Sequence, residues 1–371
     1  PVLPFSLAES QAKASRELVE FLATDQRICL LWAVCGAGKT ETVFAAMAQV
    51  LAAGGRVLFT IPRRDVVLEL APRLQKAFPN RKVTVLVGGQ GAAAELGDIV
   101  VATTHQTLRL GAVFGLVILD EADAFPYASD PALVRSVQRC VAPGGKQVIM
   151  TATPDAAHLV NVRAGLWRLV VIPVRHHGHL LPVPKVLLHR SWGENRRNVQ
   201  LVLPHSDSEQ NLSRGAADAS GDSGTAKSTF SERFPLMIFV PTIAHGRFLH
   251  RYLLEAWPGT RVEFVYAEHP YRDKLTDAFR LGEIPVLVCT SILSRGVTIP
   301  KVNVWVAWAD VEHVLDAASL VQMAGRVGRT TACPDGEVWF MAGRETRSMR
   351  QAVEMIQQAN AWAQGMTRTM M

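Results

Sequence analysis

The chain has 371 residues, of which 49% are hydrophobic and 19% are charged, and its formal net charge is +6. This composition excludes a globally disordered chain, and the length is sufficient for two domains. Because the sequence has no run of about 18 apolar residues and no signal-peptide pattern, it predicts no membrane span. The mild positive charge is compatible with a polyanionic partner.

The cysteines stand singly, five in number, and none has C-x-x-C spacing. An odd count without paired spacing argues against a disulfide framework and predicts buried, reduced thiols. The positions are Cys29, Cys35, Cys140, Cys289 and Cys333.

The first half alternates short apolar runs with amphipathic stretches. The predicted strands are Arg27–Ala33, Arg56–Ile61, Val83–Val87, Asp98–Ala102, Leu116–Asp120 and Lys146–Met150. They are almost continuously apolar, as strands buried on both faces of a parallel sheet are. Helices are predicted between them, at Thr40–Ala53 and Asp65–Ala77. This alternation predicts an α/β sheet with right-handed crossovers.

The second half repeats the same pattern. Its predicted strands are Leu236–Val240, Val262–Tyr266, Pro285–Cys289, Val302–Trp308 and Gly336–Met341. Its predicted helices are Ile243–Trp257, Arg272–Leu281, Ala317–Val327 and Arg347–Trp362. We therefore predict two similar α/β domains, at residues 1–190 and 234–371, joined by a linker at 191–233.

The linker contains a stretch rich in Ser, Asp, Gly and Ala at residues 206–231, which predicts a flexible insertion. The hinge itself is expected nearby, around Arg175–Lys185. Three histidines in that segment have no adjacent acid or thiol, so we interpret it as a linker and not as a metal site.

A glycine-rich turn, "AVCGAGKTE" at Ala33–Glu41, follows a predicted strand and opens a helix. It matches G-x-x-x-x-G-K-[ST], with Ala33 in place of the first glycine. Glycines let backbone N–H groups approach phosphates, the lysine reaches the β and γ phosphates, and the threonine hydroxyl suits Mg²⁺. The predicted ATP-binding residues are Gly36, Ala37, Gly38, Lys39 and Thr40, the last also a Mg²⁺ ligand.

Two acids end a further apolar strand in "VILDEADAF", Val117–Phe125. The carboxyl edge of the sheet would place Asp120 beside the phosphate loop, where it suits the Mg²⁺ shell. Glu121 is suited to orient and deprotonate the attacking water. Together with the phosphate loop, these acids predict ATP hydrolysis.

A glycine- and arginine-containing stretch, "LVQMAGRVGR" at Leu320–Arg329, lies in the second domain. Its residues Gln322, Arg326 and Arg329 are spaced four and three apart, which predicts one shared helix face. Paired arginines stabilise charge that develops on a γ phosphate. We therefore expect ATP to bind in a cleft between the two domains.

The ordered set of motifs resembles superfamily-two helicases and translocases. The further matching stretches are "IPRRDVVLELAPRL" (Ile61–Leu74), "TTHQ" (Thr103–Gln106), "TATP" (Thr151–Pro154), "IFVPT" (Ile238–Thr242) and "TSILSRGVTIP" (Thr290–Pro300). DEAD-box RNA helicases have His-Arg where Gln322 leads, and Arg-Gly-x-Asp where Arg295–Thr298 reads RGVT. Instead, "DEADAFPYASDPAL" and "LVQMAGRVGR" resemble the ComFA family of late-competence ATPases, which are associated with uptake of transforming DNA.

This resemblance implies two tandem RecA-like P-loop domains and an ATP-dependent single-stranded DNA translocase. A DEAD-box-like RNA helicase and a nucleotide-gated DNA-binding adaptor without motor activity stay open as alternatives. The implied partners are single-stranded DNA and competence proteins at the inner-membrane DNA channel. The implied location is cytoplasmic, either away from or at the inner face of the cell membrane. A homo-oligomer is one open alternative for the assembly.

The resemblance also assigns individual residues. It places Gln11 at the adenine, Arg295 and Gly296 at the nucleotide, and Thr151 and Thr153 in the coupling of ATP state to domain closure. It assigns DNA-phosphate contacts to Arg63, Thr103, Thr104, Thr242 and Thr290. ComFA proteins usually carry a four-cysteine zinc module before the first helicase domain. Such a module either precedes Pro1 in a longer protein or is lacking in this member, and both alternatives stay open.

Overall fold

The computed structural model describes residues 1–3, 6–89, 95–193, 201–204, 234–294, 299–330 and 334–365. The chain divides into two compact units. Unit 1 comprises Pro1–Leu180 together with Gln358–Met371, and unit 2 comprises Leu181–Gln357. The predicted insertion at 206–231 and Cys333 lie outside the described residues.

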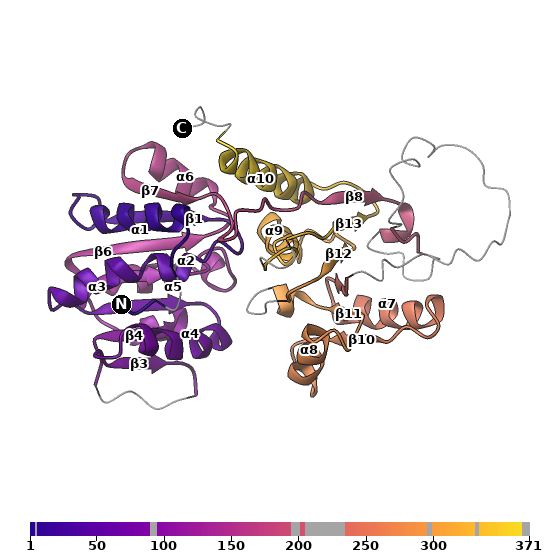
Figure 1. Cartoon of the computed structure of the whole chain (residues 1–371), viewed down its shortest axis with the longest axis horizontal. Coiled ribbons are helices and arrows are strands. Elements are labelled where there is room, and N and C mark those ends of the chain that lie inside the picture. Colours follow the sequence, from indigo (N-terminus) through magenta and orange to yellow (C-terminus); the bar gives the residue numbers. More distant parts are fainter. Residues whose placement is uncertain are drawn as a thin grey trace. The chain divides into compact units, whose positions relative to one another are not determined.

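Unit 1 is built on a seven-stranded sheet whose order is β3-β4-β2-β5-β6-β1-β7, with every pairing parallel (Figure 1). The strands are β1 (Ile28–Ala33), β2 (Val57–Ile61), β3 (Val83–Leu86), β4 (Ile99–Thr103), β5 (Phe114–Leu119), β6 (Val141–Thr151) and β7 (Trp167–Ile172). All residues of β2 and β4 are buried, as their continuous apolar runs predict. The edge strand β7 was not predicted.

The helices of unit 1 lie in the crossovers between these strands. They are α1 (Glu9–Phe21), α2 (Lys39–Thr42), α3 (Phe44–Ala52), α4 (Arg64–Ala77), η1 (Thr104–Arg109), η2 (Tyr127–Ser129), α5 (Pro131–Arg139) and α6 (Ala156–Arg163). Right-handed crossovers put α3 and α4 on one face of the sheet and η1, α5 and α6 on the other. The contacts of α1 with α3 and of α5 with η1 agree with this division.

Unit 2 has a six-stranded parallel sheet in the order β10-β11-β9-β12-β13-β8. The strands are β8 (Lys185–Leu188), β9 (Leu236–Phe239), β10 (Val262–Val265), β11 (Val286–Cys289), β12 (Asn303–Ala307) and β13 (Val338–Ala342). The helices are η3 (Arg190–Trp192), α7 (Ile243–Ala256), α8 (Arg272–Arg280), η5 (Ser291–Ser294), α9 (Ala317–Ala324) and α10 (Arg347–Ala363). Both units are therefore parallel α/β structures, as predicted.

The unit boundaries differ from the domain limits expected at 190 and 234. Strand β8 pairs with β13, so the chain joins unit 2 from Leu181 onward. The other difference is at the end of α10, where residues from Gln358 belong to unit 1. There Trp362 packs edge-on against Trp32 of β1, with ring centroids 4.4 Å apart. Both differences arise from contacts between segments that are distant in sequence.

The described cysteines, which are Cys29, Cys35, Cys140 and Cys289, are buried and form no disulfide, as predicted. Burial raises the pKa of the Cys140 thiol to about 11, although Arg139 opposes the shift. Burial also raises the pKa of Cys29 and Cys289. In the part of the chain that the structure describes, no helix is long and apolar enough to cross a membrane.

We expect stability to fall above about pH 9. The raised pKa of Cys140 means that the folded chain retains a proton between about pH 9 and about 11, while the unfolded chain releases it. The free energy of unfolding therefore decreases as pH rises through this window. Urea unfolding at pH 8 to 11 measures the slope. Cys140→Ser, which cannot ionise there, should reduce the slope by the part that Cys140 contributes beside Cys29 and Cys289, and an unchanged slope would contradict this origin.

A buried carboxylate ties α2 to α4. Arg73 of α4 donates to Glu41 of α2, whose side chain is only 6% exposed. Because Arg73→Met leaves that carboxylate without its cation, we expect the free energy of unfolding to fall by about 2 kcal/mol. Lys13→Met removes the exposed Lys13–Glu17 pair, whose charged atoms are 3.9 Å apart, and should change stability by less than about 0.5 kcal/mol. Equal urea midpoints for the two variants would disprove the difference.

Candidate nucleotide site

Three neighbouring strands of unit 1 carry the predicted ATP motifs at their carboxyl ends. Strand β6 pairs with β1 on one side and with β5 on the other. The phosphate loop follows β1, Asp120 follows β5, and Thr151 ends β6, in register with Trp32 of β1. Because parallel strands end at one edge, the loop, the acids and Thr151 meet there. The TATP stretch at Thr151–Pro154 (motif III) thus lies between the phosphate loop (motif I) and the acidic turn at Asp120–Asp123 (motif II), which the order of the chain does not reveal.

The phosphate-loop lysine and the strand-end acid form a direct ion pair. Lys39 Nζ lies 2.8 Å from Asp120 Oδ1, and the two side chains are 21% and 10% exposed. Burial lowers the pKa of the Lys39 ammonium, but Asp120, Glu121 and Asp123 together outweigh burial and raise it. Lys39 is therefore a cation at neutral pH, at the position where a phosphate would need one.

Glutamine 11 holds the phosphate loop from the side of α1. Its Nε2 donates to the carbonyls of Ala37 (2.9 Å) and Gly38 (3.2 Å), and its Oε1 accepts from the Ala8 N–H (2.8 Å). Gln11 is only 1% exposed. Both amide hydrogens of Gln11 are thus used on the loop. The adenine contact of Gln11 stays a prediction. It requires either that these hydrogen bonds rearrange or that the second lone pair of Oε1 accepts a hydrogen bond from the adenine.

The acidic turn after β5 has an unusual backbone. Glu121 has φ +52°, a left-handed conformation that costs a non-glycine residue about 1 kcal/mol or more. Its N–H donates to Asp120 Oδ1 over 2.7 Å, so one carboxylate oxygen receives both this bond and the Lys39 ammonium. Such strain is concentrated at functional sites. The geometry is consistent with separate roles for the two acids.

A threonine connects motif II to motif III. Thr151 is fully buried, and its Oγ1 donates to Asp123 Oδ1 (2.9 Å) while accepting from the Thr153 N–H (3.0 Å). The neighbouring Ala152 carbonyl accepts from Trp32 Nε1 over 3.1 Å. The end of β6 is therefore bonded both to the acidic turn and to the strand that precedes the phosphate loop. This arrangement suits the coupling role predicted for Thr151 and Thr153.

The residues present fit a nucleotide with Mg²⁺. Gly36 and Gly38 have φ +82° and +69°, the left-handed values of turns whose successive N–H groups bind one anion. The Thr40 hydroxyl and the Asp120 carboxylate supply the hard oxygen ligands that Mg²⁺ prefers. No cluster of three or more His, Cys, Asp or Glu able to hold another metal occurs among the described residues.

The predicted DNA contacts of unit 1 are less accessible than expected. Arg63 forms a bidentate ion pair with Asp65, with Nε–Oδ1 and Nη2–Oδ2 distances of 3.2 and 2.5 Å. Thr103 is 6% exposed, and Thr104 is fully buried. Their exposed neighbours Arg64, His105 and Arg109 were not predicted as contacts. Cationic side chains beside a matched motif are the signal that could have identified them.

The predicted contacts of unit 2 follow the carboxyl ends of β9 and β11. Thr242 caps α7, because its Oγ1 accepts from the His245 N–H over 3.3 Å and lies 2.8 Å from His245 Nδ1. Thr290 is half-buried directly after β11. Arg295 and Gly296 lie outside the described residues. The DNA-contact assignments therefore stay predictions.

The helix predicted to carry the stretch Leu320–Arg329, which is motif VI of the helicases, is shorter than expected. Helix α9 ends at Ala324 with Gly325 as its C-cap, so the prediction of one helix face through Arg329 was wrong. Gly328 has φ +64°, which turns the chain, and Arg329 Nε donates back to the Gly325 carbonyl over 2.9 Å. Arg326 is 1% exposed and Gln322 is 7% exposed. A glycine-bounded turn, and not a helix, presents the two arginines.

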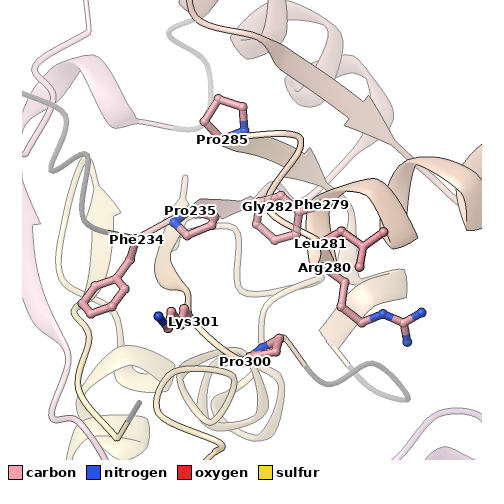
Figure 2. A pocket seen from close by; sticks show the side chains of 9 residues that line it. All are labelled: Phe234, Pro235, Phe279, Arg280, Leu281, Gly282, Pro285, Pro300 and Lys301. Atoms are coloured by element: carbon pink, nitrogen blue, oxygen red, sulfur yellow. The ribbon is translucent and has the colours of Figure 1, made fainter. Parts of the chain in front are cut away.

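Unit 2 contains a cavity of about 330 Å³ (Figure 2). Its walls precede β9, β11 and β12 and follow α8, so it lies at the amino edge of the sheet. It is lined by Phe234, Pro235, Phe279, Arg280, Leu281, Gly282, Pro285, Pro300 and Lys301. Thr242 and Thr290 follow strands at the opposite, carboxyl edge, so the cavity is separate from these two predicted contacts.

The fold and the site define a superfamily-two helicase-type enzyme that hydrolyses ATP. The family model described as "Type III restriction enzyme, res subunit" matches residues 4–156. The model described as "Helicase conserved C-terminal domain" matches residues 228–331.

Whole-chain relatives define the family more closely. Competence protein ComFA of Bacillus subtilis (strain 168) is 34% identical over 361 residues, which covers 96% of this chain and 73% of that protein. Competence protein ComFA of Streptococcus pneumoniae (strain ATCC BAA-255 / R6) is 35% identical over 359 residues, with coverage of 95% and 77%. The chain belongs to the ComFA family and is a helicase-like ATPase of that family.

More distant relatives share the fold. ATP-dependent DNA helicase RecG of Streptococcus pneumoniae serotype 4 is 23% identical over 361 residues, covering 88% of this chain and 47% of the helicase. The structure of S. cerevisiae Dbp5 bound to RNA and ADP BeF3 matches with a TM-score of 0.61 at 17% identity, covering 97% of this chain and 92% of that one. RecG bound to a three-way DNA junction matches with a TM-score of 0.58 at 18% identity, covering 99% and 47%.

Gly38→Ala should reduce the rate of ATP turnover by more than about tenfold. A Cβ at Gly38 would lie 2.2 Å from Gln11 Nε2, and φ is +69° there. Gly54→Ala is the matched control, because φ is +78° but nothing lies within 4 Å of its Cβ position. The control should lose about 1 kcal/mol of stability and no turnover. Steady-state ATP hydrolysis by the two variants measures the difference, and equal activities would refute the loop geometry.

Proposed function

We propose that this protein is an ATP-dependent single-stranded DNA translocase that moves transforming DNA during natural competence. The observation that carries the proposal is the Lys39–Asp120 pair beside Glu121 at the strand ends of unit 1. Membership of the ComFA family and similarity to ATP-dependent DNA helicases support DNA as the substrate.

The roles in unit 1 follow from the positions of the groups. Lys39 and the loop N–H groups would hold the β and γ phosphates, while Thr40 and Asp120 would hold Mg²⁺. Bound Mg²⁺ neutralises phosphate charge and orients the leaving group. Glu121 would orient and deprotonate the attacking water. The burial of these side chains strengthens each electrostatic interaction.

Motif VI would supply the charge that responds to the γ phosphate. Arg326 is buried and Arg329 is fixed to the Gly325 carbonyl, so both guanidinium groups start from ordered positions. We propose that they engage the γ phosphate and that Gln322 supports them. Thr151 and Thr153 would relay the nucleotide state, because Thr151 joins the acidic turn to the end of β6. Arg295 and Gly296 keep their proposed place at the nucleotide.

Transport of any DNA sequence requires phosphate contacts without base readout. We propose Thr242 and Thr290 for such contacts in unit 2. In unit 1 the accessible cations Arg64 and Arg109 extend the assigned set of Arg63, Thr103 and Thr104. By family membership, we also propose action at the inner face of the cell membrane with competence proteins of the DNA channel.

Two alternatives remain distinct from this proposal. An RNA helicase would use the same fold, which the Dbp5 structure shares. A nucleotide-gated adaptor would bind DNA without turnover, but the assembled Lys39, Asp120 and Glu121 favour catalysis. The choice depends on which nucleic acid accelerates hydrolysis.

The test is ATP turnover with single-stranded DNA, with RNA of equal length and with neither. We expect DNA to stimulate hydrolysis at least about tenfold and RNA to stimulate it little. Lys39→Ala and Glu121→Gln should each reduce turnover by about 10²-fold or more, because each removes a group that acts in the reaction. DNA should still bind to Glu121→Gln, whose fold and surface charge are nearly unchanged.

Stimulation by RNA alone would favour the helicase alternative. DNA binding that responds to ATP without any turnover in the unmodified protein would favour the adaptor. Survival of DNA-stimulated turnover in either variant would show that the catalytic assignment is wrong.

A further inference from the structure

The segment that follows β7 lies against the phosphate loop of unit 1. Beyond the end of the strand pairing, the Val34 N–H donates to the Ile172 carbonyl over 3.1 Å. A few residues later, His176 Nδ1 lies 3.1 Å from the Gly36 carbonyl oxygen. Since a carbonyl only accepts, Nδ1 must carry the hydrogen in this bond. The start of the predicted hinge segment, Arg175–Lys185, is therefore bonded to the loop.

Arginine 175 covers the same glycine. It is 1% exposed and is among the largest fully buried side chains. Its Cγ, Cδ and Nε each lie 3.8 Å from the position that a Cβ on Gly36 would occupy. A Cβ at that position would make ordinary van der Waals contact with the stem of Arg175, so the stem lies close to the side of Gly36 from which a side chain would project. Arginine is almost never so deeply buried unless it is paired.

A tight turn fixes both side chains. The Gly178 N–H donates to the Arg175 carbonyl over 2.9 Å, and Gly178 has φ +84°. The four residues from 175 to 178 therefore form a hydrogen-bonded turn anchored to the end of β7. Arg175 and His176 reach Gly36 from an ordered part of unit 1.

The negative charges of the site make a further positive charge near the phosphate loop favourable for binding a polyphosphate. Asp120, Glu121 and Asp123 all act on the single ammonium of Lys39. Three carboxylates against one ammonium disfavour a polyphosphate beside them. A buried guanidinium against the loop adds positive charge where the effective dielectric constant is low. The left-handed Gly36 turn, φ +82°, also needs support in the absence of any side chain of its own.

We infer that Arg175 and His176 are positioning residues of the phosphate loop, which hold Gly36 in its left-handed turn and so favour the polyphosphate of a nucleoside triphosphate. The inference rests on the ATPase function proposed above. His176 acts through the Gly36 carbonyl, and Arg175 acts through its closeness to Gly36 and through its charge. Neither residue belongs to the motifs that predicted the site.

Four variants separate these contributions. Arg175→Met keeps a stem and removes the charge, whereas Arg175→Lys keeps the charge. His176→Ala removes the donor, whereas His176→Asn places an amide N–H near the position of Nδ1. We expect the KM for ATP to rise about tenfold in Arg175→Met and about threefold in His176→Ala, with kcat within about twofold. The Lys and Asn variants should recover most of the affinity.

Hydrogen exchange of the nucleotide-free protein gives a readout that does not depend on hydrolysis. The amides of residues 35–39 should exchange several-fold faster in His176→Ala and in Arg175→Met than in the unmodified protein. His176→Asn should restore slow exchange. Arg168→Met, on the same strand β7 but at an exposed position, is the control and should change neither the exchange nor the KM.

Unchanged KM and unchanged loop exchange in Arg175→Met and His176→Ala would overturn the inference, even if the urea midpoint fell. If Arg175→Met does not fold, the variants His176→Ala, His176→Asn and Arg175→Lys still test the inference. If the unmodified protein hydrolyses no ATP, the proposed function fails, while loop exchange continues to test the positioning role.

Discussion

The ion pair between Lys39 and Asp120 is the interaction on which the rest of unit 1 depends. The two residues follow strands that are not neighbours in the sheet, because β6 lies between β1 and β5. Their 2.8 Å contact therefore requires all three strand ends to be in register at one edge. The intervening strand contributes Thr151, whose hydroxyl is bonded to Asp123. A displacement of Lys39, Asp120 or Thr151 would therefore alter the contacts of the other two.

Elements from distant parts of the chain clamp the phosphate loop on more than one side. Gln11 from α1 donates to two of its carbonyls, and His176 after β7 bonds a third, at Gly36. A loop rich in glycine pays a large entropy to be ordered, so external bonds are a physical requirement for a fixed anion site. The loop is therefore a product of the whole unit and not of its motif alone.

In unit 2 the positions of Arg326 and Arg329 depend on where helix α9 ends. The glycines at 325 and 328 end α9 and turn the chain, and this places Arg326 in the interior and ties Arg329 to a backbone carbonyl. Buried arginines with fixed geometry lose little entropy when they meet an anion. The cavity of unit 2 lies at the amino edge of the sheet, whereas Thr242 and Thr290 follow strands at its carboxyl edge.

The sequence predicts the two parallel α/β units, the phosphate loop, the acidic pair and the family, because buried strands and motif spacings are local patterns. It missed the edge strand β7, put residues 185–188 in the wrong unit, and extended α9 past Gly325. The contacts in the folded chain show in addition that Thr151 lies between the two ATP motifs, that Asp65 neutralises Arg63, and that Gln11 bonds the loop while Arg175 lies beside it. Those facts depend on burial and on hydrogen-bond partners tens of residues away, which no local pattern encodes.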